Sequence, residues 1–186
     1  MANMKQGVNL ISAITSDHRA VEAVFAELQS GTGSPQHRRD LADHVIAELV
    51  RHSVGEEQYV YPEIRRKLGD EAADHELEEH AEAEKVMNAL DGVDPTDANF
   101  DTLVDQLINT IRHHVREEEN EALPKLVAAC TPEELDHIAE QFENTKKTAP
   151  TRPHPAAPDK PPANRLLGPG AGLIDRLKDA LTGRKA

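Results

Sequence analysis

The stretch FDTLVDQLINTIRHHVREE, residues 100–118, indicates both the fold class and the chemistry of this chain. Its apolar residues recur at steps of three and four, which is the period of one face of an α-helix: Phe100, Val104, Leu107 and Ile111. The same face continues into His114 and Glu118. A buried carboxylate is costly unless it is paired, so a helix that ends its apolar stripe in this way predicts a buried polar site.

Three other segments show the same period and the same interruption. Residues 14–28 carry His18, residues 41–59 carry His52 and Glu56, and residues 70–90 carry His80. Pro62 is expected to kink the second segment or to begin a new helical turn. Four helices of this length with short loops predict an all-α protein, an antiparallel up-and-down four-helix bundle. A short fifth helix is expected after Thr131-Pro132-Glu133-Glu134, which has the pattern of a capping box.

The composition changes after residue 148. Residues 150–162 are rich in proline and predict a flexible linker, and residues 172–181 predict a short amphipathic segment with basic ends. We therefore expect a bundle domain over residues 1–148 and a proline-rich basic tail over residues 149–186.

Charge and cysteine content limit which partners and which cellular location are expected for this chain. Residues 1–145 carry 31 acidic against 12 basic side chains, whereas residues 146–186 carry 3 against 9. A domain this acidic repels phosphate backbones, so no nucleic acid is expected as a partner. The basic tail is expected to be solvated or, alternatively, to contact an anionic membrane, a partner or the protein's own acidic domain. With no apolar run long enough to span a membrane, no secretory signal and Cys130 alone, a cytoplasmic monomer is expected.

The polar interruptions form a set with metal-ligand spacing. His52/Glu56 and His114/Glu118 are each four residues apart, so each pair shares a helix face, and a proline follows each histidine at an interval of ten residues. With one inward histidine from each remaining helix, the predicted ligands are His18, His52, Glu56, His80, His114 and Glu118. Four imidazoles, two bridging carboxylates and a bridging oxo or hydroxo group leave two positions open on two octahedral metals. This ligand set without thiolate favours iron or manganese over structural zinc.

Several neighbouring residues leave alternatives open. Tyr59 is a possible further ligand or a packed aromatic residue, and Tyr61 is expected to pack. Glu57 and Glu119 are expected either to accept a hydrogen bond from a ligand imidazole or to lie on a solvated helix edge. His75 is expected to point away from the metals or, alternatively, to be a ligand; His113 is expected beside a ligand or at the surface, and His44 at the end of the bundle. His37, His137 and His154 are expected to be exposed.

These motifs resemble the hemerythrin-like, or HHE cation-binding, family over residues 8–145. The matching elements are Asp17-His18, His52 to Glu57 with Tyr61-Pro62, Glu79-His80, and His114 to Glu119 with Leu123-Pro124. The resemblance implies an antiparallel four-helix bundle around an oxygen-bridged di-iron site, with the six predicted residues as ligands.

The chain departs from the oxygen-carrying hemerythrins in two places. Those proteins have a His-x-x-x-His pair on the third helix, where this chain has Glu76, and an Asp five residues after the last ligand histidine, where it has Glu118 after four. The resemblance therefore points to the branch that handles peroxide, nitric oxide, oxygen sensing or iron response. Three functions stay open: catalase-like peroxide decomposition, a sensor or carrier of oxygen or nitric oxide, and an iron-binding protein without turnover.

Overall fold

The structure, a computed structural model, describes residues 9–154 and 163–184, and the side chains of all of these except residues 163–170. Over these residues the chain contains helices and no strand, which confirms the all-α class. The remaining residues of the expected proline-rich linker, 155–162, lie outside the described residues.

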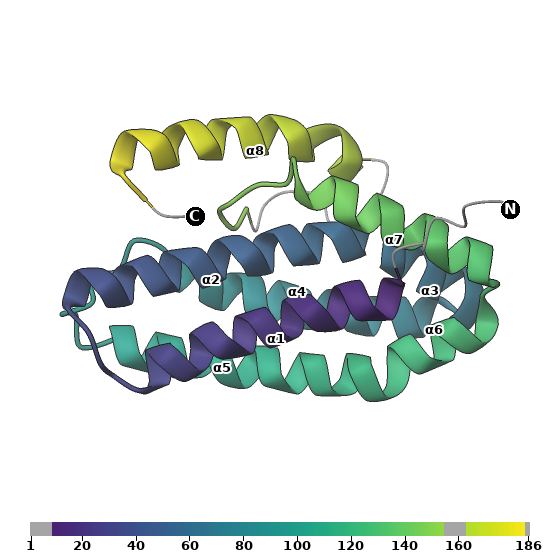
Figure 1. Ribbon diagram of the computed structural model, residues 1–186, viewed down its shortest axis with the longest axis horizontal. Coiled ribbons are helices and arrows are strands. Elements are labelled where there is room, and N and C mark those ends of the chain that lie inside the picture. Colours follow the sequence, from purple (N-terminus) through teal and green to yellow (C-terminus); the bar gives the residue numbers. More distant parts are fainter. Residues whose placement is uncertain (1–8, 155–162, 185–186) are drawn as a thin grey trace, which may run out of the picture.

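Four long helices pack side by side along the long axis of the molecule (Figure 1). They are α1(Leu10–Gln29), α2(Pro35–Gly55), α4(Asp70–Leu90) and α5(Phe100–Glu117). Each contacts two others, in the order α1, α2, α4, α5 and back to α1. Side chains cap two of the helix starts, because the Asn9 carboxamide oxygen accepts from the Ser12 N–H and the Ser34 hydroxyl accepts from the His37 N–H.

A π-helical turn follows each of the two helices that carry a His-x-x-x-Glu pair. The turn η1(Glu56–Val60) leads into α3(Tyr61–Leu68), and η2(Glu118–Ala122) leads into α6(Leu123–Ala129). Pro62 and Pro124 lie in the first turn of the helix that follows. Because proline has no N–H to continue the i to i−4 pattern, the chain makes a wider turn and then begins a new helix. Gly69, at a φ of 105°, then joins α3 to α4 through a conformation that favours glycine.

The apolar core is divided into two clusters by a layer of polar side chains. One cluster, which includes Val21, Phe25 and Ile111, lies toward the end where α1 meets α2, and the other includes Leu10, Ile14 and Ala122. Along α1, His18 falls between the two clusters, and along α5 and η2 His114 and Glu118 do so. The predicted ligands therefore occupy the middle of the core.

The expected fifth helix is α7(Pro132–Lys146). It begins with the predicted capping box: the Thr131 hydroxyl accepts from the Glu134 N–H, and the Glu134 carboxylate accepts from the Thr131 N–H. The helix packs on α1, α2 and η1. Phe142 reaches so close to Gly55 that a Cβ atom there would lie 2.7 Å from its ring.

The C-terminal part differs from the expected short, flexible tail. Thr151 and Pro153 are buried, and α8(Ala163–Thr182) is a helix of 20 residues. The carboxylates of Asp175 and Asp179 explain the difference, because they accept hydrogen bonds from Thr151 at 3.2 and 2.6 Å. The proline-rich composition did not indicate these contacts.

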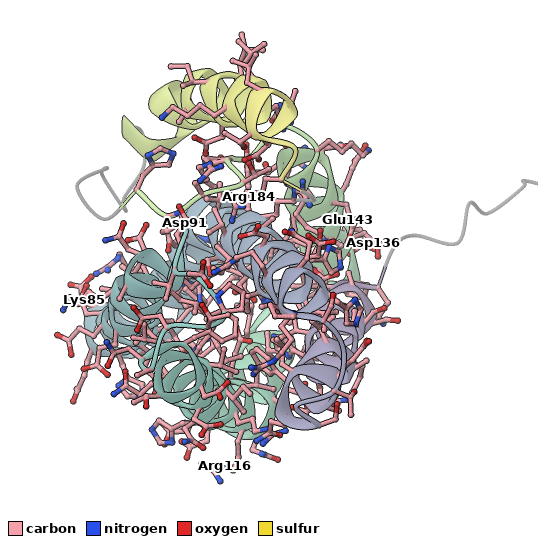
Figure 2. The ribbon with its side chains drawn as sticks, turned by 90° about the vertical axis from the view of Figure 1, so that its left-hand side faces the viewer. Lys85, Asp91, Arg116, Asp136, Glu143 and Arg184 are labelled. Carbon is pink, nitrogen blue, oxygen red and sulfur yellow. The ribbon has the colours of Figure 1, made fainter. Side chains whose placement is uncertain are left out.

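Charges also join α8 to the bundle. Arg184, beneath α8, lies 3.2 Å from both Asp43 and Asp91 of the bundle, and Figure 2 shows Arg184 and Asp91 together in this layer. Four apolar residues of α8 are more than half exposed: Leu173, Ile174, Leu177 and Leu181. Among the described residues, no helix is both long enough and apolar enough to pass through a membrane.

Candidate metal centre

All six predicted ligands are buried, and the structure brings them together. The four histidines are each no more than 6% exposed, and Glu56 and Glu118 are fully buried. One group of potential ligand atoms comes from His18, His52, Glu56 and Glu118, and further groups join Glu56 with His80 and His114, and His114 with Glu118. The spacing-based prediction thus selected side chains that converge in space.

The imidazoles face one another in two pairs. The Nε2 atoms of His18 and His52 are 3.1 Å apart, and those of His80 and His114 are 3.2 Å apart. Two nitrogen lone pairs at this distance repel unless a proton or a cation lies between them. Each pair is therefore suited to hold one metal ion.

The two glutamates lie between the histidine pairs. The Glu56 Oε2 atom is 3.1 Å from His52 Nε2 and 3.5 Å from His80 Nε2, so it reaches a histidine of each pair. Glu118 Oε2 is 3.5 Å from His18 Nε2, and Glu118 also belongs to a group with His114. Both carboxylates thus lie within reach of both histidine pairs.

A carboxylate fixes the outer nitrogen of every ligand histidine. The Nδ1 atoms of His18, His52, His80 and His114 lie 2.8, 3.0, 3.1 and 2.8 Å from Glu119, Asp17, Glu57 and Glu79, respectively. An Nδ1–H that donates to a carboxylate leaves the Nε2 lone pair directed at the centre, and it makes the imidazole a better ligand. Of the two alternatives for Glu57 and Glu119, the structure therefore shows the hydrogen bond to a ligand imidazole.

A shift of 62 residues relates the two halves of this site. It takes His18 to His80, His52 to His114, Glu56 to Glu118, and Asp17 to Glu79. It also takes η1 to η2. His18 and His80 each bond to a carboxylate of the opposite half, whereas His52 and His114 use one from their own half.

Burial and neighbouring charges shift the pKa values of these groups in opposite directions. Burial and the charge of Glu56 raise the pKa of Glu118 well above its ordinary value. Burial alone would raise the pKa of Glu56 as well, but His52 and His80 hold it well below its ordinary value. Burial and the adjacent His52 lower the pKa of His18 to about 4. The imidazoles thus stabilise the charge of Glu56 but not that of Glu118, so a cation bound between them would favour the ionised form of Glu118.

The unpaired polar atoms at the centre test whether this donor set fits metal ions. Glu56 Oε1 and both carboxylate oxygens of Glu118 are buried and have no hydrogen-bond partner among the described residues. An unpaired buried carboxylate destabilises a folded protein, and coordination to a cation would remove this cost. Buried imidazole and carboxylate donors without thiolate fit iron or manganese.

Tyr61 approaches the centre, which sequence reasoning missed. Its hydroxyl oxygen lies 2.7 Å from His80 Nε2 and 3.4 Å from Glu56 Oε2, while its ring packs in the core as expected. The reason is the π-helical turn, in which the Tyr61 N–H bonds to the Glu56 carbonyl five residues earlier and so places Tyr61 above Glu56. Tyr59 is half-buried against the same apolar cluster, and its ligand role stays a prediction.

Glu76 is a second residue near the centre that the ligand prediction did not include. It is 4% exposed, and its Oε2 atom lies 3.7 Å from His114 Nδ1. Burial and the nearby Glu79 raise its pKa to about 7. The signal in the sequence was its helical position, four residues before His80, where the family's oxygen carriers have a histidine.

The other histidines lie away from the centre. His37 and His137 are exposed, as expected, and His44, His75 and His113 are exposed as well. His154 differs from the expectation of an exposed residue, because it is half-buried and its Nε2 atom lies 2.9 Å from Asp175.

A small cavity adjoins the four predicted ligand histidines. It has a volume of about 20 Å³, and Val21, Leu49 and Ile111 close its apolar side. This is room for about one water-sized molecule. A groove of about 330 Å³ between α1 and α5 shares four wall residues with this cavity: His18, Val21, Ile111 and Val115.

Comparison with known proteins agrees with this geometry. The hemerythrin HHE cation-binding domain matches residues 9–126. The chain belongs to the hemerythrin HHE family. The matched region contains all six predicted ligands of this hemerythrin-like chain.

Two relatives show how widely this hemerythrin-like domain occurs. The chain is 34% identical to an uncharacterized hemerythrin-like protein of Schizosaccharomyces pombe over 172 residues, which cover 91% of this chain and 84% of the relative. It is 26% identical to a protein of Nostoc named DNA nickase over 142 residues, which cover 76% of this chain but only 40% of that protein. No solved structure matches the chain.

Proposed function

We propose that this chain binds two iron ions in its interior and presents them to a small ligand such as dioxygen, hydrogen peroxide or nitric oxide. The observation that carries the proposal is the pair of buried carboxylates shared between two facing imidazole pairs. In this assignment His18 and His52 would hold one iron, His80 and His114 would hold the other, and Glu56 and Glu118 would serve both. An oxo or hydroxo group would be the further ligand that the two irons share. The ring of contacts among α1, α2, α4 and α5 supports the expected antiparallel up-and-down four-helix bundle around them.

The protein groups around the centre have separate tasks. When bound, two irons supply one- and two-electron redox chemistry. The four outer carboxylates hold the imidazole Nδ1 protons and so keep each Nε2 atom free to bind metal. Burial and the charge of Glu56 raise the pKa of Tyr61 well above its ordinary value, so its hydroxyl stays protonated at neutral pH. It can then donate a hydrogen bond to Glu56 Oε2, which lies 3.4 Å away.

The cavity has room for about one water-sized molecule, so only a very small ligand fits beside the histidines. Its apolar wall at Val21, Leu49 and Ile111 excludes further water from the space beside the histidines. The groove between α1 and α5 lies next to the cavity, because Val21 and Ile111 line both spaces, and we infer that a ligand approaches from this side. Peroxide is the substrate we favour for turnover, with disproportionation to water and dioxygen as the reaction.

Nucleic-acid cleavage is not part of the proposal. The name DNA nickase is that of a relative of which this chain spans 40%. The strong negative balance of residues 1–145 disfavours contact with a phosphate backbone.

The test is to measure metal content, the visible spectrum and oxygen release on addition of hydrogen peroxide. We expect about two irons per chain in the wild-type protein, and loss of iron in His114→Ala, because one imidazole pair is broken. His137→Ala changes an exposed histidine of α7 and should keep both irons. Unchanged iron content in His114→Ala would overturn the ligand assignment. Two irons without oxygen release would move the function to sensing or iron binding without turnover.

A further inference from the structure

A second group of potential metal ligands lies on the surface, where α4 meets α5. Each helix contributes a histidine and a glutamate four residues apart, His75 and Glu79 from α4 and His113 and Glu117 from α5. Residues at this spacing share a helix face, so both pairs face the same seam. We call these four residues the α4–α5 seam cluster.

The donor atoms of the seam cluster converge. One ligand atom from each of His75, Glu79 and Glu117 lies within 4.8 Å of the others. His75 Nε2 is 3.0 Å from a Glu117 oxygen, and His113 Nε2 is 3.3 Å from the second Glu117 oxygen and 3.4 Å from Glu79. The side chains of both histidines are about half exposed, at 53% and 54%, so a cation can reach them from solvent.

This chemistry suits a divalent transition-metal cation. Two imidazoles and two carboxylates are ligands for iron, zinc or manganese. Arg116 is the positive group nearest the cluster that the contacts show, with an Nη2 atom 3.3 Å from His113 Nδ1. It is exposed, and Figure 2 shows it at the outer edge of the molecule, so its side chain can turn away when His113 Nε2 binds a cation and Nδ1 carries the proton.

The equivalent seam in the other half of the molecule, between α1 and α2, can be compared with the seam cluster residue by residue. The 62-residue shift places Ala13, Arg51 and Gly55 where the cluster has His75, His113 and Glu117. That seam is also covered by α7, since Phe142 packs on Gly55. Of the four equivalent positions in that seam, only Asp17, the counterpart of Glu79, carries a potential metal ligand, whereas all four positions do so between α4 and α5.

An ion pair also covers the seam between α1 and α2. Asp17, the counterpart of Glu79, bonds to Lys146 of α7 at 2.5 Å. Glu79 has no such lysine in the contacts of the seam cluster and turns one oxygen toward His113 instead.

The seam cluster connects directly with the buried centre. One oxygen of Glu79 faces His113, while the other lies 2.8 Å from Nδ1 of the predicted ligand His114. Beneath it, the buried Glu76 Oε2 atom is without a hydrogen-bond partner among the described residues and belongs to a group of ligand atoms with His114 and Glu118. Carboxylates therefore follow one another from solvent to the centre.

We propose that the α4–α5 seam cluster binds one divalent transition-metal cation, and that iron enters the buried centre through it. The first part stands on the seam itself, and the second rests on the proposed di-iron function. Ile14 occupies the position in the other half that corresponds to Glu76. The carboxylate path thus exists on one side of the molecule only.

The first experiment titrates the iron-loaded protein with Zn²⁺ by calorimetry and follows iron content in parallel. We expect one zinc per chain in addition to the retained iron. His75→Ala/Glu117→Gln should weaken this binding at least tenfold, since even the loss of an outer partner of a metal ligand weakens binding by about 10–100-fold. The matched control is His37→Ala/Glu27→Gln, which removes another exposed histidine–glutamate pair, 2.8 Å apart, and should bind zinc like wild type.

The second experiment mixes protein stripped of iron by a chelator with Fe²⁺ and follows loading with time. The seam variant should load several-fold more slowly but reach the same final iron content, whereas the control variant should load at the wild-type rate. No zinc binding to the wild type, or equal binding to the seam variant, would overturn the site. Equal loading rates would overturn the route. A wild type that binds zinc at the seam but never takes up iron would contradict the proposed function and leave the seam site supported.

Discussion

Tyr61 and Leu123 occupy equivalent positions in the two halves of the metal centre, and this is where single residues make the halves differ most. The hydroxyl of Tyr61 is 2.7 Å from His80 Nε2, whereas Leu123 has no polar atom to offer the His18 side. Glu76 adds to the difference, because its counterpart is Ile14. The two metals that the site would hold therefore lie in unlike surroundings.

The variant Tyr61→Phe tests this difference. It keeps the buried ring and removes only the hydroxyl, so we expect unchanged iron content and a loss of stability of about 1 kcal/mol, as for a typical hydrogen bond. In Mössbauer spectra the two irons should become more alike than in wild type. Tyr59→Phe serves as the comparison, and identical spectra for wild type and Tyr61→Phe would show that the hydroxyl does not reach the iron.

At this scale the sequence predicts the side chains that break a repeating pattern. Each of the six proposed ligands occupies a position where the helical period calls for an apolar residue, so the period alone identifies it. Tyr61 was not predicted to approach the centre, because a helical period of 3.6 residues places Tyr59, three residues after Glu56, on the same face as the ligands. The π-helical turn contains an extra residue, so Tyr61 rather than Tyr59 lies above Glu56 and faces the centre.

Among the elements, α7 has the clearest effect on the site. It closes the side of the bundle next to His52, whose ring lies edge-on to Phe142 with the ring centres 5.5 Å apart. Its start is fixed by Thr131 and Glu134, and Glu134 also contacts Lys67 at 2.9 Å. One glutamate thus both caps α7 and holds it against α3.

The variant Glu134→Gln should lower the melting temperature at neutral pH. The hydrogen bond from the Thr131 N–H and the ion pair with Lys67 lower the pKa of Glu134 from 4.5 to about 2. A pKa that is lower in the folded state stabilises the fold above the unfolded value, and this contribution is lost as the pH falls from about 4.5 toward 2. The difference in melting temperature from wild type should therefore shrink over this range. Glu133→Gln removes the neighbouring charge and should have a smaller effect; a pH-independent difference for Glu134→Gln would contradict the assignment.

The elements could be predicted where local patterns specify them. Apolar periodicity and the capping box of Thr131 located the four long helices and α7. The π-helical turns and the docking of α8 could not be predicted in this way. The first depend on how Pro62 and Pro124 are accommodated within a packed bundle, and the second depends on Asp175 and Asp179 meeting Thr151, more than 20 residues away in sequence.

In the molecule as a whole, the carboxylates whose burial is energetically unfavourable lie at the centre. Glu56 and Glu118 are fully buried between two apolar clusters, and three of their four oxygens have no hydrogen-bond partner among the described residues. Such a core is destabilised by its own carboxylates unless cations offset their charge. Metal binding and folding are therefore coupled.

Removal of iron by a chelator should lower the melting temperature by about 10 °C. A ligand present at a thousand times its dissociation constant stabilises a protein by about 4 kcal/mol, and 1 kcal/mol corresponds to about 2–4 °C for a chain of this size. Returning Fe²⁺ should restore the melting temperature, whereas Mg²⁺, which prefers oxygen ligands, should not. Equal melting temperatures with and without iron would show that the buried carboxylates do not need the metal.

The 62-residue correspondence has a consequence for the ancestry of the chain. Two helical hairpins with the same order of ligands at a constant separation are what duplication and fusion of a single gene segment produce. The two hairpins differ in their surroundings, because α7 packs over the first and Glu76 lies within the second. They are not free to diverge independently, because Glu119 holds His18 and Glu57 holds His80 across the hairpin boundary. A substitution of either glutamate therefore arises in one hairpin but removes the hydrogen bond of a predicted ligand histidine in the other.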